Sequence, residues 1–129
     1  MKTKLTLEES ARLIELGIDL KMASECVSAM KVYASGRGII RLPESNPIFT
    51  LPDLLSILPK EIDYNGLTYE LNLWVYKATW YIEYVVETEF NQWDALNTDN
   101  FDSPELIDAL YQLLIWAIEN NYVKPNKDN

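Results

Sequence analysis

The spacing of apolar residues predicts three helices in the first half of the chain. Thr6–Glu9 forms a capping box and opens an amphipathic stripe that ends at a glycine. Residues 19–34 keep helical spacing and predict a second helix. Thr50–Asp53 supplies a cap, an early proline and an acid for a short third helix, which Pro59 ends.

A longer helix is predicted near the C-terminus. Ser103–Glu105 provides an N-cap, a proline at the first helical position and an acid in the first turn. Nearly every position from 106 to 118 is apolar, so this helix should be buried over most of its circumference and form the spine of the core. Trp116 falls among the few positions expected on its outer side.

Alternation of apolar and polar residues predicts strands between these helices. The Asn-Gly pair at 65–66 is the strongest hairpin signal and joins a strand near 61–64 to a longer one at 67–75. A turn near 76–78 leads to a further strand at 79–86. The simplest arrangement is a three-stranded antiparallel meander.

The remaining segments complete the expected fold. We predict a short strand at 38–42, a loop over 43–47 and one or two helical turns near 89–96. The fold class is α+β: a small three-stranded antiparallel meander packed against a long C-terminal helix and N-terminal helices. Residues 1–123 are expected to form a single domain and residues 124–129 a disordered tail.

Aromatic rings occur on both faces of the predicted meander. One face contains Tyr69, Leu71, Trp80 and Tyr84, which we assign to the core. The other face, which is the candidate partner-binding surface, contains Glu70, Trp74, Tyr76, Tyr81 and Glu83. Either the N-terminal helices cover this second face, or it meets a partner, since Trp and Tyr are enriched in protein interfaces.

The charge of the chain is unevenly distributed. Its 129 residues have a net charge of −9, whereas residues 44–119 contain 14 acidic and 2 basic residues, a net charge of −12. This disfavours direct binding to nucleic acid or to an anionic membrane surface, because both need cations on the protein. The N-terminus lacks the apolar segment of a signal peptide, so a cytoplasmic location is expected.

The residues that most often perform catalysis are scarce. The chain has no histidine, so Cys26 cannot form a Cys–His pair, and we expect it to be a small buried apolar residue. None of the four glycines belongs to a phosphate-binding motif. We therefore predict no catalytic residue, no cofactor and no enzymatic activity.

Two acidic groups were considered as sites. Glu70 and Glu83 lie on neighbouring predicted strands, and a solvated sheet face explains them better than acid–base catalysis. A second group lacks the ligand spacing and central glycine of a calcium loop, so no metal site is predicted there. This group comprises Asp94, Asn97, Asp99 and Asp102.

Three stretches together indicate a family. In this order, LTLEESARLIELGID, FTLPDLLSILPKEI and LIDALYQLLIWAIENNYV resemble segments of short, uncharacterised proteins of gut Bacteroidales-type bacteria and of their phages and mobile elements. The resemblance covers most of the chain in outline, but residues 19–48 match poorly. It implies a prophage or mobile-element context and brings neither an activity nor functional residues.

The sequence therefore favours a non-enzymatic protein-binding or adaptor protein that uses the aromatic and acidic sheet face. Its partner would be a protein, with a basic one favoured by the charge. Two alternatives stay open: an acidic nucleic-acid mimic that inhibits a DNA-binding host protein, and a structural homo-oligomer in which the aromatic face meets itself.

Overall fold

The computed structural model describes residues 1–35, 38–89, 92–96 and 101–124. The helices are α1 (Leu7–Glu15), the 3-10 turn η1 (Leu20–Met22), α2 (Leu51–Ile57) and α3 (Leu106–Glu119). The strands are β1 (Glu25–Ser35), β2 (Gly38–Ile48), β3 (Glu61–Tyr64), β4 (Leu67–Tyr76), β5 (Thr79–Glu87), β6 (Trp93–Ala95) and β7 (Phe101–Ser103).

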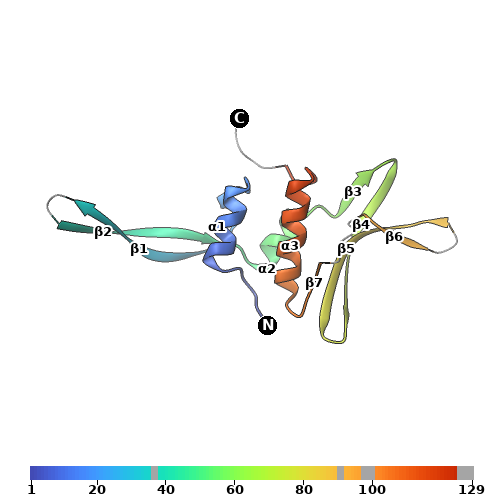
Figure 1. Ribbon diagram of the computed structural model, residues 1–129, viewed down its shortest axis with the longest axis horizontal. Helices are drawn as coiled ribbons and strands as arrows, with labels where there is room; N and C mark the ends of the chain where they lie inside the picture. Colours follow the sequence, from blue (N-terminus) through green and yellow to red (C-terminus); the bar gives the residue numbers. More distant parts are fainter. Residues whose placement is uncertain (36–37, 90–91, 97–100, 125–129) are drawn as a thin grey trace.

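The helices lie between two separate antiparallel sheets (Figure 1). One sheet is the β1–β2 hairpin, which reaches away from the helices. The other has the order β3-β4-β5-β6, with β7 also paired to β5. The α+β class is confirmed, but the predicted three-stranded meander is only the first part of a five-stranded sheet.

The core is built around α3. Eight residues of this helix are buried, and it packs against α2 on one side and against β5 and β7 on the other. Tyr84 of β5 is completely buried, and its ring stacks on Trp116 with 6.2 Å between centroids. The expectation that Trp116 points outward was wrong, because the sheet covers that side of the helix. Trp80 and Leu71 are partly buried against the same core.

The N-terminal segment ties α1 to α3. The Lys2 ammonium forms ion pairs with Glu9 (3.0 Å) and Asp108 (2.7 Å), while its backbone N–H donates to Glu105 (2.8 Å). The hydrogen bond to Asp108 makes the largest contribution to raising the pKa of Lys2. Two carboxylates near the N-termini of two helices thus share one cation, and Glu105 is held by the backbone of the same residue.

The largest error of the sequence analysis concerns residues 19–48. The predicted helix over 19–34 is a single 3-10 turn followed by β1, and the predicted loop over 43–47 belongs to β2. Each residue of β1 is paired with one of β2, from Glu25↔Ile48 to Ser35↔Gly38. Short apolar runs suit either a helix or a strand, and the partner strand decides. Cys26 is exposed on β1 and is not the buried residue expected.

Two smaller corrections concern the region before α3. The helical turns expected near 89–96 include strand β6 instead. Ser103 lies in β7 and accepts a hydrogen bond from the N–H of Glu105, which is the actual N-cap. Part of this region and most of the tail predicted at 124–129 lie outside the described residues.

The predictions for the central hairpins were right. Asn65 and Gly66 have φ values of 50° and 80°, as a tight turn with two left-handed residues requires. Lys77 and Ala78 make an equivalent turn between β4 and β5 with φ values of 50° and 62°, although neither is glycine. The capping boxes predicted for α1 and α2 are also present.

Asp53 fastens both ends of the β1–β2 hairpin to α2. Its Oδ2 accepts hydrogen bonds from the N–H of Thr50 (2.8 Å), the N–H of Ser24 (2.9 Å) and the hydroxyl of Ser24 (2.9 Å). Ser24 precedes β1 and Thr50 follows β2. Burial by itself would raise the pKa of the Asp53 carboxyl, but these hydrogen bonds outweigh it and lower the pKa below its usual value.

We expect Asp53→Asn to lower the free energy of unfolding at pH 7 by about 1 kcal/mol, because hydrogen bonds to a charged acceptor are stronger than those to a neutral one. The contribution of a depressed carboxyl pKa is present above the unfolded value, near 4, and is lost as pH falls through the folded value. Urea unfolding from pH 7 to pH 2 should therefore show the two proteins converging in acid. Asp94→Asn, at an exposed position, is the control, and a difference independent of pH would contradict this account.

Tyr84 offers a test of the buried core. Its hydroxyl donates to the carbonyl of Pro59 at 2.8 Å, and burial raises its pKa. Tyr84→Phe should cost about 1 to 2 kcal/mol at neutral pH, since the carbonyl loses its partner. Because the unfolded phenol ionises near pH 10, wild-type stability should fall above that pH, more steeply than that of the variant. Tyr64→Phe, at an exposed site, should change neither, and equal stability of Tyr84→Phe would disprove the role given to the hydroxyl.

Candidate protein-binding face

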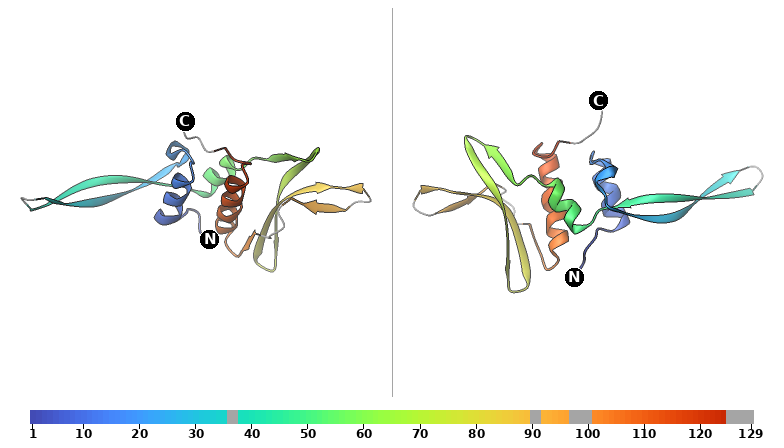
Figure 2. Two further views of the ribbon diagram at one scale, coloured as in Figure 1. Left: turned by 45° about the horizontal axis from the view of Figure 1, so that its top comes forward. Right: turned by 180° about the vertical axis from the view of Figure 1, so that it is seen from behind.

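Within residues 1–35, 38–89, 92–96 and 101–124, no helix covers one of the two faces of the five-stranded sheet. Side chains alternate between the faces of a strand, and paired residues lie on the same face. α3 packs against the face containing Ile82 and Tyr84, and Figure 2 shows the helices together on that side of the sheet. The opposite side is called the outer face. It comprises Glu61, Asp63, Thr68, Glu70, Asn72, Trp74, Tyr76, Thr79, Tyr81, Glu83, Val85, Glu87, Trp93, Ala95 and Asp102.

A stacked aromatic pair lies on the outer face between β4 and β5. Trp74 and Tyr81 are cross-strand partners whose rings lie 4.4 Å apart with an interplanar angle of 16°. Trp74 is nevertheless 42% exposed. Neighbouring Tyr76 is 56% exposed, and the ammonium of Lys77 lies 5.4 Å from its ring centre. The pair is thus held rigidly by its own stacking while one side remains open to solvent.

Six carboxylates share this face with the rings. They belong to Glu61, Asp63, Glu70, Glu83, Glu87 and Asp102. Within the part of the chain that the structure describes, none of them forms an ion pair. Thr68 donates a hydrogen bond to Asp63 at 2.7 Å. The face therefore combines apolar area with a negative potential that the protein itself leaves uncompensated.

Trp93 of β6 stands between two small hollows on this face. One, of about 250 Å³, is lined by Asn72, Glu83, Val85 and Trp93. The other, of about 240 Å³, lies across the ring and includes Glu70 and Glu87. Val85 is 7% exposed and lines both hollows, whereas Trp93 is 62% exposed. Each hollow thus has an aromatic wall, an aliphatic base and at least one carboxylate.

The residues predicted from the sequence all lie on the outer face, in two groups. Trp74, Tyr76 and Tyr81 gather at the end of the β4–β5 hairpin, while Glu70 and Glu83 lie further along the same strands beside Trp93. Three of these side chains are exposed (Glu70, Trp74 and Tyr76), and two are partly exposed (Tyr81 and Glu83). The N-terminal helices do not cover them, which removes the alternative of a sheet sandwiched between helices.

Trp93 and Val85 were not among the residues predicted for this surface. Trp93 was placed in a helical turn, and its three-residue strand is too short to show alternation. Its pairing with Glu87 brings it onto the outer face. The only signal in the sequence was an isolated tryptophan in a polar segment.

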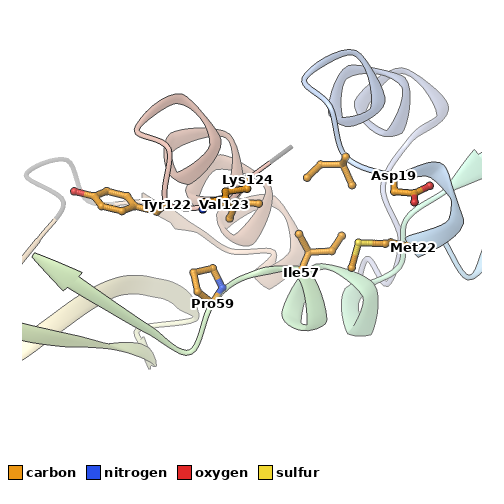
Figure 3. A pocket seen from close by; sticks show the side chains of 8 residues that line it. Asp19, Met22, Ile57, Pro59, Tyr122, Val123 and Lys124 are labelled. Atoms are coloured by element: carbon orange, nitrogen blue, oxygen red, sulfur yellow. The ribbon is translucent and has the colours of Figure 1, made fainter. Parts of the chain in front are cut away.

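A third hollow lies away from the sheet, between η1, the end of α2 and the residues after α3 (Figure 3). Its volume is about 280 Å³, and Ile18, Met22 and Ile57 contribute to its largely apolar wall. The carboxylate of Asp19 already accepts a hydrogen bond from the N–H of Lys21. The hollow presents no nucleophile with a base beside it among the described residues.

Over the described ranges, no three Cys, Asp or Glu side chains are grouped so that they could hold a metal ion. Four residues were compared above with a calcium loop. Two of them, Asn97 and Asp99, lie outside the described ranges, and the other two, Asp94 and Asp102, lie on different strands. No helix in the described part of the chain has the length and apolar character to cross a membrane.

Comparisons of the chain with protein-family models, with curated proteins and with solved structures find no match. The resemblance to short proteins of gut bacteria and their mobile elements therefore stays a prediction.

Proposed function

We propose that this chain is a protein-binding adaptor whose outer face holds a basic, arginine-containing segment of a partner. The observation that carries the proposal is the stacked Trp74–Tyr81 pair, exposed on a face with six unpaired carboxylates. A sheet face that contacts only water is normally polar. Rings left partly open there retain apolar area that a partner can bury.

The chemistry of the outer face favours arginine over other partner groups. A guanidinium stacks on an aromatic ring and donates two parallel hydrogen bonds to a carboxylate. Trp93 supplies such a ring beside Glu83 in one hollow and beside Glu70 and Glu87 in the other. The long-range attraction of the acidic face would speed the encounter with a basic segment, and the rings would slow its release.

The two alternatives from the sequence are less well supported by the same face. A nucleic-acid mimic needs carboxylates in a continuous row at phosphate-like spacing, whereas rings and Val85 lie between the carboxylates here. Self-association through this face would bring two sets of six carboxylates together, and such like-charge contacts are costly. A basic protein partner relieves the repulsion instead.

Titration with a synthetic peptide that alternates arginine and valine tests the proposal, with isothermal calorimetry as the measurement. Trp74→Ala should weaken binding roughly thirtyfold, since a central aromatic anchor contributes about 2 kcal/mol. The double change Glu70→Gln and Glu83→Gln should weaken it roughly tenfold and reduce its dependence on salt.

Matched controls separate binding at this face from general effects. Val75→Ala alters the same strand on its opposite side, and Glu119→Gln removes a carboxylate at the end of α3; both should bind like wild type. A lysine–valine peptide should bind more weakly than the arginine peptide. Equal affinities for Trp74→Ala and wild type, or no binding by wild type at low salt, would refute the proposal.

A further inference from the structure

The β1–β2 hairpin has two open edges and is attached to the protein only at its base. Figures 1 and 2 show it reaching away from the helices on the side opposite the five-stranded sheet. No third strand pairs with it among the described residues, and its most extensive contact with another element is that of β2 with α1. An isolated two-stranded hairpin is marginally stable in water. A ribbon of this length therefore gains from a further strand.

The two edges differ in their capacity to accept that strand. In an antiparallel pair, every second residue directs its N–H and C=O outward. Pro43 and Pro47 of β2 have no N–H to offer β1, and they lie four residues apart, so both occupy outward-directed positions. The prolines leave the outer edge of β2 without two of its donors. Their partners Met30 and Cys26 hold the equivalent outward positions on β1, and no proline interrupts that edge.

The charge of the hairpin favours a second copy of this chain as the partner of its free edge. Most of the protein is acidic, and two identical molecules repel each other over residues 44–119, whose net charge is −12. Residues 25–48 instead contain three basic and two acidic residues. Two copies can therefore meet at the hairpin with much less repulsion than along the acidic part of the chain.

The two charged residues of β1 select one register for self-pairing. They are Glu25 and Lys31. If two β1 strands run antiparallel about a two-fold axis at Ser28, Glu25 of each copy stands opposite Lys31 of the other. The same register places Cys26 opposite Met30, so that outward-directed residues face each other as backbone pairing requires. The charge pairs and the hydrogen-bond pattern thus agree on a single alignment.

We propose that two copies of this protein pair edge to edge through β1, about an axis at Ser28, to form a four-stranded antiparallel sheet. This surface is separate from the outer face, so neither proposal depends on the other. The dimer would present two outer faces, which raises the effective affinity for a partner with repeated basic segments.

Proline substitutions at two paired residues, one on β1 and one on β2, test which edge of the hairpin binds the second copy. Ser28 and Ser45 are paired across the hairpin. They lie two residues from Met30 and Pro43, so the alternation of the ladder directs their N–H groups outward as well, and proline at either position should remove no hydrogen bond between β1 and β2. Sedimentation velocity of the full chain should show wild type dimerising as its concentration rises. Ser28→Pro should weaken the dimer roughly a hundredfold, because both central hydrogen bonds are lost. Ser45→Pro, on the edge already blocked, should dimerise like wild type.

Charge reversal tests the register without proline. Glu25→Lys and Lys31→Glu should each weaken the dimer roughly tenfold, and the double variant should restore it. Glu25 also forms an exposed ion pair with Lys4 at 3.3 Å, which the double variant does not restore. A wild-type monomer at every concentration, a dimer insensitive to Ser28→Pro, equal weakening by Ser45→Pro, or a double variant no better than the single ones would each overturn the proposal.

Discussion

The arrangement of the other elements depends on one buried helix, α3. α3 is apolar around most of its circumference, so it must be covered on several sides at once. α2 covers one side and the face of the sheet that contains Tyr84 covers another. The described residues form no second helix of this kind, and α1 and α2 lie on the far side of α3 from the sheet (Figure 1). The helices that the structure describes therefore leave the outer face uncovered.

The β1–β2 hairpin is likewise left uncovered by the described helices beyond its base. Asp53, Ser24 and Thr50 fix its base through a compact set of hydrogen bonds, while its length extends beyond the core. The protein thus has a packed centre and two surfaces that its own residues do not complete. They differ in chemistry. The outer face supplies rings and negative charge suited to a basic side chain, and the β1 edge supplies backbone groups suited to another strand.

The sequence predicted those elements whose determinants are local. Capping boxes at Thr6 and Thr50 and the Asn-Gly turn at 65–66 are fixed by neighbouring residues, and all were right. It also placed Trp74 and Tyr81 on one face, because alternation in a strand is a local property. It failed for β1 and β6, where pairing with a distant strand outweighs a spacing equally compatible with a helix. Trp93 was missed for that reason.

Binding of a partner requires that the outer face be open in the free protein, and the four tryptophans measure this directly. Trp74 and Trp93 lie on the outer face, whereas Trp80 and Trp116 pack against the core. Hydroxyl-radical footprinting with mass spectrometry should find Trp74 and Trp93 oxidised much faster than Trp80 and Trp116. Protection of Trp74 equal to that of Trp116 would show that the chain covers this face itself, and would contradict the account.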